Sequence, residues 1–192
     1  MARLRTFIGV EATDEIRSAG QRLIRKMSQT AAGVRWVDAE NIHLTLKFLG
    51  EVDEREIHQI CRQAADAARV CAPFQIPCLA VGAFPSPHRP RTIWMGVNDH
   101  EGQLAQLHKS IETGLSELGI PAESRRFHGH LTLGRVRYNR RGSEDLTHIM
   151  AAEADVQFGV LPVDEVIVYS SQLSRSGPTY TALGRCPLGE SP

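Results

Sequence analysis

Close cysteine pairs, net charge and long apolar runs are all missing from this 192-residue sequence. Its cysteines, at positions 61, 71, 78 and 186, form no CxxC pair, which argues against a zinc knuckle or a redox motif. We interpret Cys61 and Cys78 as core residues of a reduced protein. Lys plus Arg and Asp plus Glu each number 22, so the chain is no globally basic nucleic-acid binder. No apolar run approaches the roughly 18 residues that span a bilayer, so we expect a cytoplasmic protein without membrane association.

Aromatic residues are also scarce, at 6%, but hydrophobic residues make up 42% of the chain, enough for a folded core. The spacing of the apolar residues alternates between the strand and helix periods. Strands are expected at 5–10, 42–49, 74–81, 92–97, 131–136, 156–160, 163–169 and 180–183. Helices are expected after Thr13, after the capping box formed by Asp53 and Glu56, over 104–118 and over 143–150.

Two segments of the sequence recur at one offset. The tetrapeptide His-Leu-Thr-Leu occurs at 43–46 and again at 130–133, 87 residues later. The same shift carries Phe-Ile-Gly-Val at 7–10 onto Trp-Met-Gly-Val at 94–97. Two matches at one offset indicate an internal duplication. We therefore predict a single α+β domain over residues 1–192, built from two pseudo-symmetric lobes around a central cleft. Each lobe would be a mostly antiparallel sheet with helices on the outside.

The repeated tetrapeptide places chemistry on one face of a strand. Because side chains alternate, His43 and Thr45 share one face while the leucines between and after them point to the core, and His130 and Thr132 do the same. Two converging imidazoles can act as acid and base on opposite sides of a phosphorus atom without a metal, and the threonine hydroxyls can bind phosphoryl oxygens. Two rival interpretations stay open: ordinary surface histidines, and zinc ligation by His43, His130 and His128.

A local basic segment surrounds the second copy of the motif. Between residues 124 and 143 there is no Asp or Glu, but there are six arginines, at positions 125, 126, 135, 137, 140 and 141. Arg89 and Arg91, in a proline-rich loop, extend the positive charge. Such a patch suits phosphate groups, and we take Arg126 and Arg135 as candidate substrate-binding residues.

Several motifs together resemble the two-histidine phosphoesterase superfamily, and within it the RNA 2′,3′-cyclic phosphodiesterases, also called 2′-5′ RNA ligases. The first signature is His-Leu-Thr-Leu-Lys-Phe-Leu-Gly at 43–50, preceded by Arg-Trp-Val at 35–37, and the second spans 127–135. Further similarities are Gly-Ala-Phe-Pro at 82–85, Pro90-Arg91 with Trp94, Ser-Gln-Leu at 171–173, Gly177 and Tyr180. The resemblance covers almost the whole chain.

This resemblance implies a two-lobed α+β fold and hydrolysis of a 2′,3′-cyclic phosphate to a 2′-phosphomonoester, with no cofactor. It implies that His43 donates a proton to the leaving 3′ oxygen, that His130 accepts one from water, and that Thr45 and Thr132 bind the phosphate. The expected substrates are RNA ends or cyclic nucleotides, with tRNA halves as a further candidate. The alternatives are a 2′-5′ RNA ligase acting on tRNA halves and a nucleotide-binding module with weak turnover. Nothing in the sequence argues against a monomer.

One residue departs from the family pattern, which often has proline just before the second motif. Here Phe127-His128-Gly129 precedes His130, and strand alternation puts the side chains of His128 and His130 on one face. From the sequence, His128 is a bystander, a phosphate contact or a competitor for the role of the base.

Overall fold

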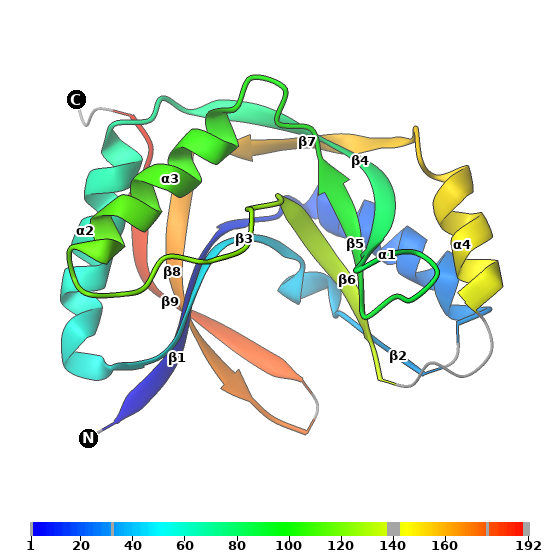
Figure 1. Cartoon of the computed structure of the whole chain (residues 1–192), viewed down its shortest axis with the longest axis horizontal. Helices are drawn as coiled ribbons and strands as arrows, with labels where there is room; N and C mark the ends of the chain where they lie inside the picture. Colours follow the sequence, from blue (N-terminus) through cyan, green and yellow to red (C-terminus); the bar gives the residue numbers. More distant parts are fainter. Residues whose placement is uncertain (1, 32, 138–142, 176, 190–192) are drawn as a thin grey trace.

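The strands of the computed structural model form one curled antiparallel sheet (Figure 1). The structure describes residues 2–31, 33–137, 143–175 and 177–189. Over these residues, nine strands pair in the order β7-β4-β5-β6-β3-β1-β8-β9, with β2 also paired to β6. The strands are β1 (Arg3–Glu11), β2 (Val34–Trp36), β3 (His43–Asp53), β4 (Phe74–Phe84), β5 (Thr92–Val97), β6 (His130–Val136), β7 (Gln157–Val163), β8 (Glu165–Leu173) and β9 (Pro178–Pro187).

The sheet divides into two halves that meet at one residue pair. Strands β1, β3, β8 and β9 form the first half-sheet, and β2, β4, β5, β6 and β7 form the second. Between them, β3 and β6 are joined at Leu44 and Leu131. Next to this junction, β5 lies beside β6 in one half-sheet and β1 lies beside β3 in the other. The strands that carry the repeated segments therefore occupy equivalent positions in the two half-sheets. The α+β prediction is confirmed, with the refinement that the two halves are continuous through this narrow junction.

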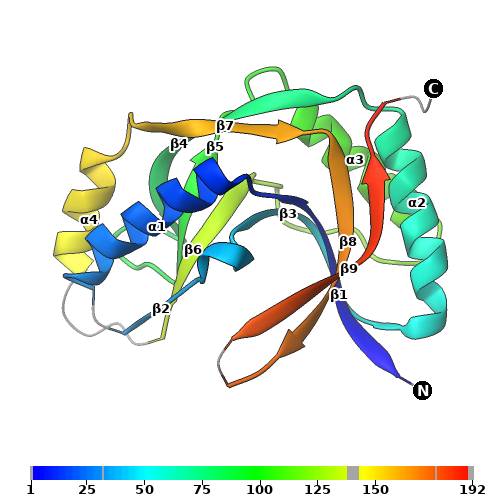
Figure 2. The ribbon, with the colours of Figure 1, turned by 180° about the vertical axis from the view of Figure 1, so that it is seen from behind.

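Helices cover the outside of both half-sheets (Figures 1 and 2). In the described residues they are α1 (Asp14–Ser28), α2 (Ile57–Arg69), α3 (Gln103–Ser116) and α4 (Ser143–Ala152), with short 3-10 turns η1 (Ala39–Asn41) and η2 (Glu54–Glu56). Thr13 caps α1 by accepting a hydrogen bond from the backbone N–H of Ile16, and Asp53 and Glu56 form the predicted capping box. In that part of the chain, no helix has the length and apolar character needed to cross a bilayer.

The two halves exchange helices. Helix α1 follows β1 in the chain, yet it packs against β6 and β7 of the second half-sheet. Helix α3 follows β5, yet it packs against α2 and β3 on the first. The close approach of α1 depends on Gly20, where a Cβ atom would lie 2.8 Å from Ile42 Cδ1. Each helix thus follows a strand of one half-sheet and packs on the other half-sheet. The two helices therefore hold the half-sheets together across the narrow junction.

The core lies between the helices and the outer face of the sheet. Leu44, Leu46, Leu131 and Leu133 are all buried there, as the alternation in the repeated tetrapeptide predicts. Cys78 is fully buried and Cys61 packs against the core. The histidines and threonines of the tetrapeptides therefore lie on the opposite, inner face.

Candidate active site

His43 begins β3 on the inner face and is held at one ring nitrogen. Its Nδ1 lies 2.7 Å from the backbone oxygen of Asn41. Because a carbonyl only accepts, Nδ1 carries the proton and Nε2 is left for exchange. The hydroxyl of Thr45 lies 3.0 Å from Nε2. Phe7 stacks on the imidazole at 4.8 Å and Tyr180 meets it edge-on at 5.1 Å, so the ring has one defined orientation.

His130 begins β6 in the same way. Its Nδ1 lies 2.7 Å from the backbone oxygen of His128, and Phe84 meets the ring edge-on at 5.1 Å. Asn41 and His128 are themselves 87 residues apart, so both copies of the motif use the same anchor. The side chain of His128 is exposed and packs edge-on against Phe84 and Trp94. The hydrogen bond between these two residues therefore uses the backbone of His128.

The register of β3 and β6 brings the two motifs together. Antiparallel pairing at Leu44 and Leu131 sets His43 across from Thr132, and Thr45 across from His130. Each histidine thus stands beside the threonine of the other copy on the inner face. The four side chains thus lie together, as the predicted convergence of the two pairs requires, and the charge of His130 acts on His43.

Burial is the main electrostatic influence on both histidines. It lowers the pKa of His43, because removal from water disfavours the charged ring, while the Asn41 carbonyl opposes the shift and the charges of His130 and Arg135 add to it. Burial likewise lowers the pKa of His130, with the His128 carbonyl opposing and the charges of His128 and Arg135 adding. An anion bound between the rings would favour their protonated forms and so raise both pKa values.

A bulge in β6 brings Arg135 to this site. Leu133 has no partner on β5, while Thr132 pairs with Trp94 and Arg135 pairs with Thr92. Because Trp94 and Thr92 share a face, the extra residue turns Arg135 to the face of Thr132. Without the bulge, alternation would point it away. Its charge acts on both histidines, so the structure groups this predicted substrate-binding residue with them.

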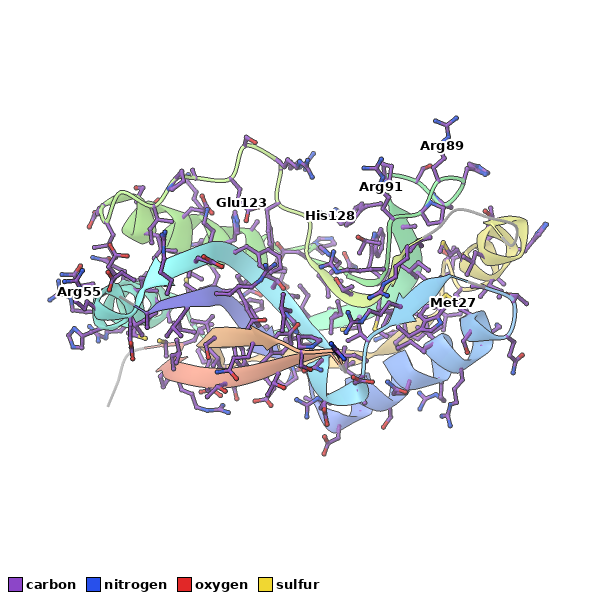
Figure 3. All side chains as sticks on the ribbon, turned by 90° about the horizontal axis from the view of Figure 1, so that it is seen from below. Met27, Arg55, Arg89, Arg91, Glu123 and His128 are labelled. Atoms are coloured by element: carbon purple, nitrogen blue, oxygen red, sulfur yellow. The ribbon has the colours of Figure 1, made fainter. Side chains whose placement is uncertain are left out.

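The other described arginines of the basic segment are not among the charges that act on the two histidines. Arg126 is exposed on the loop before β6. Arg125 and Arg137 are also exposed, while Arg140 and Arg141 lie outside the described residues. Figure 3 shows His128 between the two half-sheets, with Arg89 and Arg91 on the neighbouring loop of the second half. Of the described arginines of the basic segment, Arg135 is therefore the one grouped with the histidines.

Aromatic residues that sequence reasoning did not assign to the site support both histidines. Tyr169 faces Phe7 across β1 and β8 and stacks on it at 5.0 Å. At the position 87 residues before Tyr169 stands Gly82, which faces Trp94 across β4 and β5. A Cβ atom on Gly82 would lie 2.4 Å from Trp94 Cη2, so the indole occupies the space that glycine leaves. The 87-residue shift pairs Phe7 with Trp94 in the sequence, and the structure shows that both rings lie beside the histidine of their own half.

A cavity of about 290 Å³ lies beside His43, between η1 and the β8–β9 hairpin. Its walls include Glu11, Arg17, Tyr169 and Tyr180. As for metals, the part of the chain that the structure describes has no group of three or more His, Cys, Asp or Glu side chains placed to hold an ion.

The curled sheet and the paired His-x-Thr strands define a two-histidine phosphoesterase. A sequence model of the family described as LigT like Phosphoesterase matches residues 10–94 and 96–180. A protein of Thermotoga maritima named RNA 2′,3′-cyclic phosphodiesterase is 34% identical over 185 residues, which is 95% of each chain. The chain therefore belongs to the LigT-like phosphoesterase family.

Solved structures agree with this assignment. A crystal structure of a Thermus thermophilus protein covers 97% of this chain and 100% of its own, with a TM-score of 0.81 and 28% identity. The crystal structure of E. coli LigT complexed with 3′-AMP covers 97% of this chain and 99% of its own, with a TM-score of 0.76 and 25% identity.

Proposed function

We propose that this protein hydrolyses the 2′,3′-cyclic phosphate of RNA ends or nucleotides to a 2′-phosphomonoester. The observation that carries the proposal is the pair of histidines, each anchored at Nδ1 by a backbone carbonyl, so that Nε2 is the ring nitrogen that can exchange a proton. The Thermotoga relative bears the name of this activity, and E. coli LigT binds a nucleotide, 3′-AMP. Both support the proposed substrate class.

In the proposed mechanism His130 is the base and His43 the acid. A water molecule attacks the phosphorus and gives its proton to Nε2 of His130. The bond from phosphorus to the 3′ oxygen breaks, and that oxygen takes the proton of Nε2 of His43. The products are a 3′ hydroxyl and a 2′-phosphate, so no oxidant or co-substrate besides water is needed.

The threonines and Arg135 hold the phosphate in this scheme. Thr45 and Thr132 donate hydrogen bonds to the non-bridging oxygens, and Arg135 adds positive charge beside them. In the free protein the Thr45 hydroxyl is engaged with Nε2 of His43. Substrate binding therefore exchanges that hydrogen bond for one to a phosphoryl oxygen, which also frees Nε2 to act on the leaving group.

The test is incubation with 2′,3′-cyclic AMP in excess EDTA, followed by separation of 2′-AMP from 3′-AMP. We expect turnover to survive chelation and to give 2′-AMP, because two imidazoles replace the metal-bound hydroxide and the Lewis acid. Loss of activity in EDTA that one divalent ion restores would refute the metal-independent mechanism. A 3′-AMP product would refute the assignment of the leaving oxygen.

A further inference from the structure

Asn41 is a buried polar residue that joins two elements beside the site. It is the last residue of η1 and is 8% exposed. Its side-chain amide donates a hydrogen bond of 3.1 Å to the backbone oxygen of Pro178, at the start of β9; we call this hydrogen bond the amide bridge. Its backbone oxygen accepts from Nδ1 of His43 at 2.7 Å. One residue therefore contacts both the first histidine and the β8–β9 hairpin.

The β8–β9 hairpin is the second support of the His43 ring. Tyr180, two residues after Pro178, meets the imidazole edge-on at 5.1 Å. Strand β9 ends the strand order, so in the described sheet it pairs with a strand on one side only. The cavity beside His43 separates the hairpin from η1, and Asn41 and Pro178 both line it. The amide bridge therefore joins two walls that side-chain packing does not fill, and it fixes the strand that carries Tyr180.

The equivalent residue of the second half is braced in a different way. His128 stands 87 residues after Asn41 and supplies the carbonyl that holds Nδ1 of His130. Its side chain is exposed and packs edge-on against Phe84 and Trp94. The two backbone anchors are thus alike, whereas one is braced by a buried hydrogen bond and the other by ring packing. A change at the amide bridge should therefore affect one histidine of the pair.

We infer that Asn41 is a positioning residue for His43, because its amide bridge to Pro178 holds both the carbonyl at Nδ1 and the hairpin that carries Tyr180. It acts through the histidine rather than on the substrate. The inference rests on the proposed function, in which Nε2 of His43 protonates the leaving oxygen. If the bridge is lost, the ring can turn and carry Nε2 away from that oxygen. A misplacement of about 1 Å can lower a rate by ~10²-fold.

The amide bridge also bears on the charge of His43. The Asn41 carbonyl opposes the lowering of the His43 pKa by burial. The other ionisable groups around the ring are Glu11, Arg17 and Glu40 in the cavity wall, Tyr169 and Tyr180 on the hairpin, and His130 and Arg135 on β6. Glu11 and Arg17 form an ion pair with each other at 2.9 Å. A weaker hydrogen bond from Nδ1 to the carbonyl should therefore lower the pKa of His43 further and leave that of His130 unchanged.

The test compares Asn41→Leu, which keeps the branched shape but removes the donor, with the wild-type protein on 2′,3′-cyclic AMP. We expect kcat to fall by roughly 10- to 100-fold with KM within about twofold, because the substrate contacts remain while Nε2 is misplaced. In an NMR titration of the imidazoles we expect a lower pKa for His43 and no change for His130. Gln21→Leu removes another amide hydrogen bond, to the backbone oxygen of Val37 at 3.3 Å. It is the matched control and should change neither kcat nor the two pKa values.

Pro178→Gly tests the amide bridge from the hairpin side, and it replaces Asn41→Leu if that variant does not fold. Glycine keeps the accepting carbonyl but frees the backbone that the proline ring fixes. We therefore expect a smaller decrease in kcat than for Asn41→Leu, together with a downward shift of the pKa of His43 alone.

Three results would overturn the inference. They are a wild-type kcat for Asn41→Leu, or for Pro178→Gly where Asn41→Leu does not fold; an equal loss of kcat in Gln21→Leu; and equal pKa shifts of His43 and His130. Because the titration needs no turnover, it separates this inference from the proposed function. A wild-type protein that does not hydrolyse cyclic AMP would refute the proposed function, while a shift confined to His43 would still support the amide bridge.

Discussion

Glu112→Gln should lower the free energy of unfolding more than the removal of any exposed charge. The reason is that it leaves the buried ammonium of Lys47 without its counter-ion. Lys47, in the first histidine motif, points to the core side of β3 and is 2% exposed. Its ammonium forms an ion pair with Glu112 of α3 and donates to the backbone oxygen of Pro121 at 2.9 Å. Glu112 in turn accepts from the backbone N–H of Glu123 at 3.1 Å. The amide of glutamine keeps an acceptor for Glu123 but removes the charge that offsets Lys47.

The structure gives the expected order of effects. Removing one partner of a buried pair typically costs ~3–5 kcal/mol of unfolding free energy, since the other charge stays buried alone. Lys47→Met should cost less, about 1.5–3 kcal/mol for the lost charged hydrogen bonds, because Glu112 keeps Glu123 and is partly exposed. The double variant should resemble Lys47→Met, well short of the sum of the single effects.

Urea and thermal unfolding at pH 7 measure these differences. For a chain of this size, 3–5 kcal/mol corresponds to a decrease in Tm of about 6–20 °C. A cost below ~1 kcal/mol for Glu112→Gln, or a larger cost for Lys47→Met than for Glu112→Gln, would refute the reasoning. Asp66→Asn, in an exposed ion pair with Arg69, is the matched control and should change stability little.

Three further predictions concern the site. The kcat/KM profile should be bell-shaped with both limbs below the ordinary imidazole pKa of 6.5, because burial lowers the pKa of both His43 and His130. Activity is lost at low pH because the base is protonated, and at higher pH because the acid is deprotonated. Arg135→Gln should shift both limbs to higher pH, because the charge of Arg135 lowers the pKa of both histidines. Limbs above pH 6.5 in the wild type would contradict this prediction. His130→Ala should lower kcat/KM by ~10²–10⁴-fold. His128→Ala should keep most of the wild-type kcat/KM, because the hydrogen bond to His130 uses the backbone of His128. The reverse result would assign the role of the base to His128. Arg126→Ala should reduce the salt dependence of oligonucleotide binding and leave mononucleotide turnover unchanged, and an equal effect on both substrates would make it part of the site.

The sequence predicts what local periodicity controls. Alternation in the tetrapeptides correctly places Leu44 and Leu131 in the core and the histidines on the other face. Capping chemistry at Thr13 correctly begins α1. Both depend on residues a few positions apart. The strand β9 extends beyond the predicted 180–183 because its pairing with β8 continues on both sides of that apolar segment.

Long-range packing explains what the sequence could not predict. Arg135 reaches the site through an unpaired Leu133, and whether a strand bulges depends on its neighbour rather than on its own pattern. Lys47 is charged and would be expected in solvent, but Glu112 lies far along the chain on a helix exchanged from the other half. Phe48 follows the apolar pattern of a strand, and only the structure shows that nothing in the described chain covers half of its surface.

The duplicated site raises the question of which histidine acts as the acid. Both rings have the same carbonyl anchor, so the motif itself gives no preference. The ring contacts differ: Phe7 stacks on the His43 ring and Tyr180 meets it edge-on, whereas Phe84 meets the His130 ring edge-on. In-line displacement puts the attacking water and the leaving 3′ oxygen on opposite sides of the phosphorus, so the histidine beside the ribose acts as the acid and the other as the base. We propose that His43 is the acid, as the family resemblance implies, and a substrate oriented the other way would exchange the two roles.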